Sequence, residues 1–252
     1  MKVVLVGYGK MGKEIEKILI SRGHEVIDKA TEGNPLSENM LKNADVAIDF
    51  STPHSVLHNI DFLLRHNVPS IIGTTGWNDA YSIVKSQVEK NEGALVHASN
   101  FSIGVNLFFK LNEQLAELMK PYKEYTTSIT EIHHTEKLDA PSGTAITLAE
   151  GIIENNNQLT SWYCTSTDSP TLPQSDKSDE NTAHKNALKI EAIREYDVKG
   201  THTIEYKSNI DTLSIQHEAH NRTGFALGAV IAAEWIQNKK GIFTMKDVLQ
   251  LS

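Results

Sequence analysis

The sequence predicts an α/β protein with two domains, and two observations support this. Between residues 3 and 98, short continuous apolar runs alternate with helical patterns, which is typical of a parallel sheet buried on both faces. From residue 126 onward, strand-like runs follow one another with turns or long connections between them. That change indicates a second, α+β domain with an antiparallel or mixed sheet.

The composition is that of an ordinary globular protein and excludes several classes. A chain of 252 residues is long enough for two domains, or for one with an excursion. The net charge of -8 argues against nucleic-acid binding, which needs a basic surface. With Cys164 as the one cysteine, neither an internal disulfide nor a cysteine-based zinc cage can form. The apolar runs at Met1–Gly7 and Phe225–Ala233 are too short for a signal peptide or a membrane span, so we expect a cytoplasmic protein without membrane contact.

The first strand-like run, Val3–Val6, leads into the glycine-rich turn Gly7-Tyr8-Gly9-Lys10-Met11-Gly12. A helical pattern follows, and then a short strand, His24–Ile27, which Asp28 closes. This is the sequence context of a dinucleotide site. Asp28 follows Gly7 by 28 − 7 = 21 positions, against about 20 for the acid that binds the ribose. Lys29 can hold a 2′-phosphate that Asp28 would repel, so the choice between NADH and NADPH stays open.

The alternation of strands and helices continues to residue 98. In an open parallel sheet, ligands bind outside the carboxyl ends of the strands. Two polar loops follow such ends, Gly73-Thr74-Thr75-Gly76 and Ala98-Ser99-Asn100-Phe101, and both are candidates for the nicotinamide side of the site. Ordinary turn chemistry explains the same residues equally well. The strands expected here are Ala44–Phe50, Val68–Ile72 and Gly93–Ala98, and the helices are Val56–Leu64 and Ala80–Lys90.

The second half of the chain has a different pattern. Gly104–Met119 and Arg222–Asn238 read as helices, and Gly241–Leu249 begins a short one. Asn155–Asn186 is rich in polar residues and proline, and we interpret most of it as an exposed connection with one strand around Trp162–Thr165. Four further strand-like runs are Thr126–Ile132, Leu188–Glu195, Gly200–Lys207 and Asp211–His217.

One stretch concentrates the groups that carry chemistry. His133, His134 and Lys137 follow a strand, and the turn Pro141-Ser142-Gly143-Thr144 precedes a helix. Proline sits where helices begin, and Ser142 or Thr144 can accept from an N–H of the first turn. The N–H groups of Ser142, Gly143 and Thr144 would then point outward at the positive end of the helix dipole, an arrangement that binds anions. A basic loop with a helix cap, the alternative, explains this combination less well.

These motifs resemble those of the 4-hydroxy-tetrahydrodipicolinate reductase family, also called dihydrodipicolinate reductase, which acts in the diaminopimelate route to lysine. The resemblance extends along the whole chain and departs from the family in two places. The glycine turn is one residue shorter than is common, and Asp28-Lys29 stands where some members have an acid followed by arginine. The matching motifs are Glu131-Ile132-His133-His134 through Lys137, Asp139-Ala140-Pro141-Ser142-Gly143-Thr144-Ala145, Gly73-Thr74-Thr75-Gly76, Ser99-Asn100-Phe101-Ser102, Gly200-Thr201-His202, His220-Asn221-Arg222, Phe225-Ala226 and Gly228-Ala229.

The resemblance implies an activity, a cofactor and a domain arrangement. Members of the family reduce 4-hydroxy-tetrahydrodipicolinate to tetrahydrodipicolinate with loss of water, using NADH or NADPH. A Rossmann-type domain of residues 1–103 and 221–252 would bind the dinucleotide. An inserted domain of residues 104–220, with an open mixed sheet, would bind the small dicarboxylate substrate and form a homotetramer.

The resemblance also implies residue roles, with His133 as the catalytic acid/base and Lys137 as the proton donor. This fits the chemistry, because the carbanion left when an unsaturated imine takes a hydride needs a proton, and carboxylates need cationic or N–H partners. The substrate would lie against His134, Ser142, Gly143 and Thr144. The cofactor would be surrounded by Gly7, Tyr8, Gly9, Lys10, Met11, Gly12, Asp28, Lys29, Gly73, Thr74, Thr75, Ala98, Ser99, Asn100 and Phe101.

Three other interpretations compete with this one. A different Rossmann oxidoreductase would use His133 as a base, and its substrate would not need to be a dicarboxylate. A metal site from His133, His134 and Glu136 is disfavoured because adjacent histidines on a strand point to opposite faces, so we expect no metal. A non-catalytic protein that senses NAD(P) would lack a proton donor, whereas Lys137 is present.

Overall fold

The computed structural model describes residues 1–166 and 186–251, which form two compact units. The first unit comprises Met1–Asn106 with the described part of Arg222–Ser252. The second comprises the described part of Leu107–Asn221. The boundary between Asn106 and Leu107 falls in the first turn of helix α5 (Ile103–Met119).

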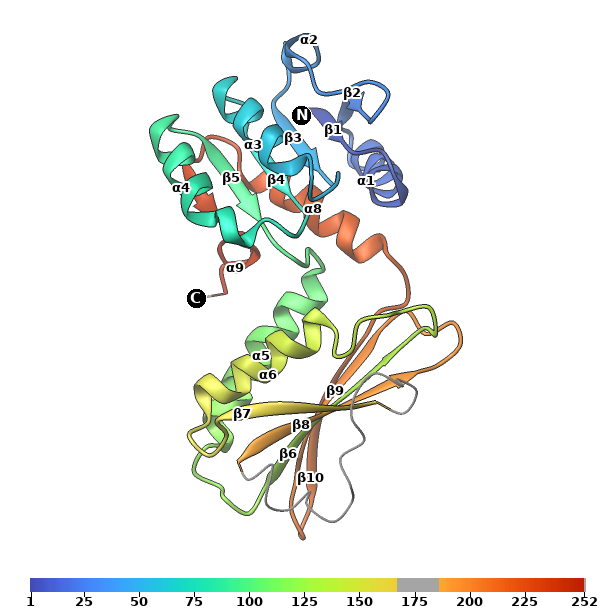
Figure 1. The fold of residues 1–252 in the computed structure, drawn as a ribbon, viewed down its shortest axis with the longest axis vertical. Coiled ribbons are helices and arrows are strands. Elements are labelled where there is room, and N and C mark those ends of the chain that lie inside the picture. The colour runs from blue at the N-terminus through green and yellow to red at the C-terminus, as the bar shows by residue number, and fades with distance from the viewer. Residues whose placement is uncertain (167–185, 252) are drawn as a thin grey trace. The chain divides into compact units, whose positions relative to one another are not determined.

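The first unit is built on a six-stranded parallel sheet (Figure 1). The strand order, β11-β5-β4-β3-β1-β2, confirms the Rossmann-type domain. Every residue of β3 and β4 is buried, as expected for central strands with helices on both faces. The strands are β1 (Lys2–Val6), β2 (Glu25–Ala30), β3 (Val46–Asp49), β4 (Ser70–Ile72), β5 (Ala94–His97) and β11 (Gly241–Phe243).

Strand β11 differs from the helix expected over Gly241–Leu249. Gly241–Phe243 pairs in parallel with β5, and only Met245–Val248 is helical, as α9. The expectation of a helix over the whole segment is wrong because pairing with a distant strand outweighs the local preference of three residues. Helix α9 then begins at a capping box between Thr244 and Asp247.

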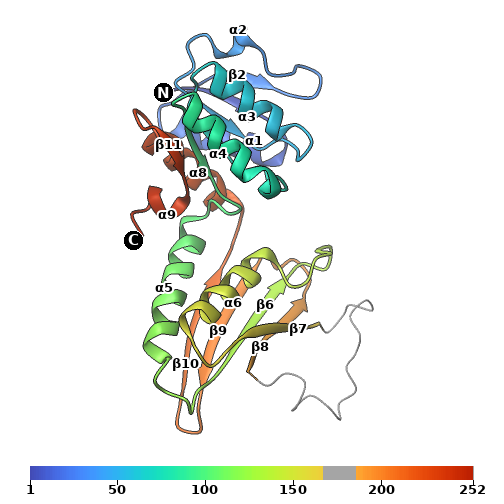
Figure 2. The same cartoon turned by 60° about the vertical axis from the view of Figure 1, so that its left-hand side comes forward.

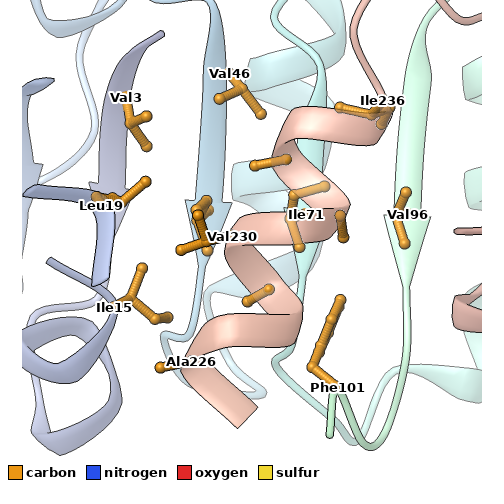
Figure 3. Packing of buried hydrophobic residues seen from close by; sticks show 14 of the residues in the cluster. Val3, Ile15, Leu19, Val46, Ile71, Val96, Phe101, Ala226, Val230 and Ile236 are labelled. Atoms are coloured by element: carbon orange, nitrogen blue, oxygen red, sulfur yellow. The ribbon is translucent and has the colours of Figure 1, made fainter. Parts of the chain in front are cut away.

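Helices cover both faces of this sheet. α1 (Lys10–Ser21) and α8 (Thr223–Trp235) share one face, where their apolar side chains meet those of the strands (Figure 3). α8 packs closely because of Gly228: a Cβ there would lie 1.7 Å from the carbonyl oxygen of Phe101. The other face carries α2 (Glu38–Leu41), α3 (Val56–Arg65) and α4 (Tyr81–Lys90), and the 3-10 helix η1 (Asn78–Ala80) precedes α4.

The second unit is a five-stranded mixed sheet with α5 and α6 (Gly143–Asn155) along one face (Figures 1 and 2). In the order β10-β9-β6-β8-β7, β8 is parallel to both of its neighbours, and β9 is antiparallel to both of its own. This confirms the mixed sheet that the sequence predicts. The strands are β6 (Thr126–His133), β7 (Ser161–Ser166), β8 (Ala187–Arg194), β9 (Thr201–Lys207) and β10 (Thr212–Glu218).

The connection expected over Asn155–Asn186 is described in part. Its strand around Trp162–Thr165 is present as β7, whereas residues 167–185 lie outside the described residues. Among the helices that the structure describes, none has the length and apolar character needed to cross a membrane.

Candidate functional site

The three glycines of the G-x-G-x-x-G turn meet three different requirements. Gly7 has a φ of +87°, and a Cβ there would lie 2.3 Å from the carbonyl oxygen of Phe50. A Cβ on Gly12 would lie 2.4 Å from the carbonyl oxygen of Gly7, where α1 packs against the turn. Gly9, at the N-cap of α1, has no heavy atom within 4 Å of its Cβ position. The turn therefore keeps open space at the positive end of the α1 dipole, which suits a phosphate.

A cavity of about 720 Å³ opens beside this turn, where β1, β2 and β3 end. β2 continues to Ala30, beyond the end at Ile27 expected from the sequence. As a result, Asp28 and Lys29 lie within the strand and outside the lining of the cavity, whereas Glu32 belongs to the lining. The lining residues are Val6, Gly7, Tyr8, Gly9, Ala30, Thr31, Glu32, Pro35, Leu36, Phe50, Ser51, Thr52, His54, Ser55 and Asn59.

Lys29 is paired within the protein. Its Nζ lies 2.6 Å from Glu16 Oε1 and 4.3 Å from the ring centroid of Tyr8. The hydrogen bond with Glu16 raises the pKa of Lys29 and lowers the pKa of Glu16. A contact between Lys29 and a 2′-phosphate would therefore have to replace this pair.

Asp49, at the end of β3, is fully buried and joins two loops. Its Oδ1 accepts from the Ser51 N–H at 2.9 Å and from the Thr74 hydroxyl at 2.7 Å. Its Oδ2 accepts from the Asn59 side-chain amide at 2.9 Å. One carboxylate thus orders both the loop after β3, which lines the cavity, and the loop after β4.

The other predicted cofactor residues belong to the same unit but do not line this cavity. Gly73 packs against Phe50, whose ring would lie 2.2 Å from a Cβ. Asn100 accepts from the Ser102 N–H at 2.9 Å and so shapes its own loop, and Phe101 is buried beside α8 (Figure 3). Apart from Asp28 and Lys29, the predicted residues outside the lining are Lys10, Met11, Gly12, Gly73, Thr74, Thr75, Ala98, Ser99, Asn100 and Phe101.

In the second unit, the stretch after β6 is organised around a buried carboxylate. Glu131 is 0% exposed, and both of its oxygens accept from the Ser142 N–H, at 3.2 and 3.0 Å. Arg194 of β8 and His202 of β9 face it, with Nη1 3.5 Å and Nε2 3.6 Å from its oxygens. Burial raises the pKa of Glu131, but the hydrogen bonds from His202 and Ser142 outweigh burial and lower the pKa to about 2. The Glu131 side chain is therefore ionised near neutral pH and is not a proton donor.

His133, the predicted acid/base, is 8% exposed, and its Nδ1 lies 3.7 Å from Glu131. Its Nε2 faces Gly200, where a Cβ would come within 3.2 Å. Burial lowers the pKa of His133 to about 4, although the charge of Glu131 acts in the opposite direction. The imidazole is therefore neutral near neutral pH in this structure. The next residue, His134, has a buried Nδ1 without a hydrogen-bond partner among the described residues.

Lys137, the predicted proton donor, lies in the loop between β6 and α6 and is paired with Asp139. Its Nζ donates to both carboxylate oxygens, at 2.8 and 2.7 Å. Burial raises the pKa of Asp139, but the hydrogen bond from Lys137, the charge of Lys137 and a backbone hydrogen bond together lower it below its usual value. The lysine side chain is 19% exposed.

Ser142 is the N-cap of α6, as predicted, and its polar groups are occupied. Its Oγ accepts from the Ala145 N–H at 3.2 Å and lies 3.1 Å from His202 Nε2. Its own N–H donates to Glu131, so the expectation that this N–H points outward to an anion is wrong. Gly143 and Thr144 open the helix, and backbone N–H groups of a first turn have no intrahelical acceptor. These two N–H groups are the ones suited to an anion.

One group of three side chains among the described residues, Glu131, His133 and His202, could hold a metal ion by geometry, with ligand atoms within 4.8 Å of one another. It differs from the set of His133, His134 and Glu136 considered from the sequence. The carboxylate already accepts an N–H and faces the guanidinium of Arg194, whose charge would repel a second cation. The cluster is therefore poorly suited to a metal ion.

Glu32, Asp49 and Arg194 have no role in the sequence-based prediction. A signal existed for the two acids, because each follows or ends a strand at the edge of the sheet where ligands bind. Arg194 ends β8 and gave no comparable signal, since exposed arginines at strand ends are common.

Two family models match nearly the whole chain. The model of the N-terminus of dihydrodipicolinate reductase matches residues 1–101, and the model of its C-terminus matches residues 104–249. The 4-hydroxy-tetrahydrodipicolinate reductase of Christiangramia forsetii is 46% identical over 252 residues, covering 99% of this chain and 98% of that protein. The one from Alkaliphilus metalliredigens is 31% identical over 254 residues and covers 100% of both chains.

Solved structures share the fold. A dipicolinate-bound dihydrodipicolinate reductase from Paenisporosarcina sp. TG-14 matches with a TM-score of 0.74 and 23% identity over 97% of each chain. An amine dehydrogenase from Mycobacterium smegmatis matches with a TM-score of 0.60 and 8% identity, covering 97% of this chain and 95% of that one. The family itself follows from the two models and the sequence relatives: this chain belongs to the dihydrodipicolinate reductase family.

Proposed function

We propose that the first unit binds NADH or NADPH and that the second unit binds 4-hydroxy-tetrahydrodipicolinate and protonates it during reduction. As a member of its family, the chain is an NAD(P)H-dependent oxidoreductase of diaminopimelate and lysine biosynthesis that forms tetrahydrodipicolinate. The observation that carries the residue assignment is the cluster around Glu131, which brings together two imidazoles and the N-terminus of α6 and reaches the backbone of Lys137 through Arg194. It combines proton donors with N–H groups for carboxylates, and this reduction needs both.

For the cofactor, which supplies the hydride when bound, we propose that the pyrophosphate lies over Gly9 and the adenosine ribose near Glu32. Glu32 is the acid that lines the cavity after β2, so it takes the role expected of Asp28. Gly73–Thr75 and Ala98–Phe101 remain the predicted nicotinamide-side loops. A carboxylate binds ribose hydroxyls and repels a 2′-phosphate, and neither lysine nor arginine is among the described lining residues. We therefore propose that the chain prefers NADH to NADPH.

The preference is tested with Glu32→Gln, which removes the charge and keeps the size of the side chain. We expect the ratio of the Kd for NADPH to the Kd for NADH to fall by about tenfold, the equivalent of about 1.4 kcal/mol. Nicotinamide fluorescence during titration of each nucleotide gives both constants without turnover. Asp28→Asn is the matched control, because Asp28 lies outside the cavity lining. If the ratio changes in Asp28→Asn and not in Glu32→Gln, the ribose role belongs to Asp28.

For the substrate, we propose that the chain binds two carboxylates and supplies a proton at each of two steps. One carboxylate accepts from the N–H groups of Gly143 and Thr144, and the other binds His134; Ser142 holds the helix start. The Lys137 ammonium protonates the carbanion that develops as carbon takes the hydride. His133, neutral in the free protein, gains a proton more readily once a dianion lies beside it, because a neighbouring negative charge raises its pKa. It can then act as the acid for loss of water.

Lys137→Ala and His133→Ala test these roles through oxidation of NADH with freshly prepared hydroxy-tetrahydrodipicolinate. We expect kcat to fall by roughly 10²–10⁴, the range of general acid catalysis, with an unchanged far-UV spectrum and Tm. Lys240→Ala is the control, since Lys240 forms an exposed pair with Glu92 in the first unit. Wild-type turnover in both site variants would refute the assignment.

We also propose a homotetramer assembled through the second unit, and a cytoplasmic location. α5 and α6 both cover the same face of the five-stranded sheet (Figure 2), and none of the described helices covers the opposite face, which we propose meets other subunits. Light scattering after size exclusion gives the mass directly. A mass of one chain, 28.0 kDa, at working concentration would refute the assembly.

A further inference from the structure

We propose that Arg194 and Glu131 are positioning residues that hold the middle and the C-terminal end of the loop between β6 and α6, and thereby set where Lys137 can act. Neither residue is assigned to substrate or cofactor. The inference rests on the proposed function in one respect, because it takes Lys137 as the proton donor carried by this loop.

Arg194 binds the middle of the loop through its backbone. Its Nε donates to the carbonyl oxygen of Lys137 at 3.3 Å, and its Nη2 donates to the carbonyl oxygen of Asp139 at 2.7 Å. The third nitrogen, Nη1, donates to the Ile193 carbonyl at 2.9 Å and lies 3.5 Å from Glu131. All three nitrogens of the planar guanidinium are therefore used, and its side chain is 9% exposed. A lysine ammonium has neither this planar geometry nor the same reach.

Glu131 holds the far end of the same loop. Both of its oxygens accept from the Ser142 N–H, which precedes the first residue of α6. Because the carboxylate is fully buried, it is stable only with such partners, and Arg194 supplies the compensating charge. The two side chains thus form one unit: Arg194 fixes the carbonyls on both sides of Leu138, and Glu131 fixes the N–H where the loop ends.

Few other restraints on this loop come from the described residues. Lys137 N–H bonds to the His134 carbonyl within the loop, and Leu138 is 97% exposed at its tip. Asp139, which pairs with the lysine ammonium, belongs to the same segment, so the ammonium moves with it. Removing the guanidinium therefore shifts Lys137 and Asp139 together while their ion pair stays intact.

The experiment compares Arg194→Lys and Glu131→Gln with wild type. Arg194→Lys keeps the positive charge beside Glu131 and loses the planar guanidinium with its several N–H donors. Glu131→Gln keeps the shape of the Glu131 side chain and loses its negative charge. Each is measured for kcat and KM, for binding of pyridine-2,6-dicarboxylate, and for amide hydrogen exchange in peptides covering residues 134–142. The matched control is Arg65→Lys, which alters an exposed arginine on α3 that pairs with Asp61.

We expect kcat of Arg194→Lys to fall by about 10²-fold, the loss typical of ångström-scale misplacement, with a KM within a few-fold of wild type. Exchange should rise in residues 134–142 and stay unchanged in the body of α6. Glu131→Gln should raise exchange at Ser142 and shift the pH profile of kcat downward, because the carboxylate supports the charged form of His133. The other groups that face His133 are His202 of β9, Arg194 of β8 and Lys137, and all three act against that charge.

Wild-type kcat and loop exchange in Arg194→Lys would overturn the proposal. So would exchange that rises equally across β6, β8 and α6, because that pattern describes general destabilisation. If Arg194→Lys does not fold, the kcat and the loop exchange of Glu131→Gln test the proposal in its place. A wild-type protein without turnover would refute the proposed function and not this inference, since exchange in residues 134–142 and dicarboxylate binding are measured without catalysis.

Discussion

Gly9→Ala adds a methyl group to the glycine turn at a point where the protein itself offers no obstacle. No heavy atom lies within 4 Å of the Cβ position, and the φ of −78° is one that alanine adopts readily. The space that the methyl group would fill is the space above the N-terminus of α1, where we place the pyrophosphate. The substitution therefore separates binding of the nucleotide from stability of the fold.

Gly9→Ala should have a small effect on the stability of the fold and a larger one on nucleotide binding. Replacing glycine by alanine stabilises the fold by about 0.4–1 kcal/mol, because alanine lowers the conformational entropy of the unfolded chain. Alanine is also a poorer N-cap than glycine by a similar amount, so the free energy of unfolding should stay within about 1 kcal/mol of the wild-type value. In a chain of this size that is a Tm change of about 2–4 °C. A pyrophosphate pushed off the turn loses at least one charge-assisted hydrogen bond, about 1.5–3 kcal/mol, so the Kd for NADH should rise by about 10- to 100-fold.

Gly12→Ala is the contrasting variant. Its Cβ would meet the Gly7 carbonyl oxygen at 2.4 Å, so the helix must move away from the turn. Overpacking of this kind costs about 1–3 kcal/mol, and the Tm should fall accordingly. Fluorescence titration with NADH and thermal melts of both variants give all four numbers. A Gly9→Ala protein that binds NADH as tightly as wild type would show that the pyrophosphate does not lie over this turn.

Two further predictions concern stability. Gly228→Ala should destabilise the first unit by about 3 kcal/mol and lower the Tm by about 6–12 °C, because a Cβ would lie 1.7 Å from the Phe101 carbonyl oxygen; an unchanged thermal melt would contradict the close approach of α8. Burial lowers the pKa of His133 to about 4, below about 6.5 in the unfolded chain, so the unfolded state binds more protons between these values and stability falls on acidification from pH 6.5 to 4. His133→Asn should flatten the dependence of Tm on pH in that window, and equal slopes in both proteins would contradict it.

The main architecture could be predicted because its signals are local and repeated. Runs such as Val3–Val6 are apolar at every position, since a central parallel strand is covered on both faces, and each is followed by a periodic helix. The glycine turn is similarly explicit, because φ and close approach leave no other residue possible at Gly7.

The end of β2 could not be located in this way. β2 is the last strand in the sheet order, and most of its residues are only half-buried, so polar residues can continue the strand. Asp28-Lys29 therefore looked like a strand end, although the ladder with β1 runs on to Ala30. The end of β2 expected from the sequence was therefore three residues too early, and Glu32, which follows the strand, was not considered as a ribose-binding acid. β11 was missed for a related reason, because only its pairing with β5 makes three residues a strand.

The two buried carboxylates, Asp49 and Glu131, show why local sequence patterns cannot identify every residue of the candidate site. Asp49 accepts the N–H of Ser51, and Glu131 accepts the N–H of Ser142, so in each unit a fully buried acid binds the backbone of a loop at the predicted ligand site. Burying a carboxylate is expensive, and an apolar pair of equal volume is often as stable or more so. A charge retained in such a place is better explained by what it orients than by the stability it adds. Its partners also come from distant strands, as Arg194 does for Glu131, so only the folded chain identifies it.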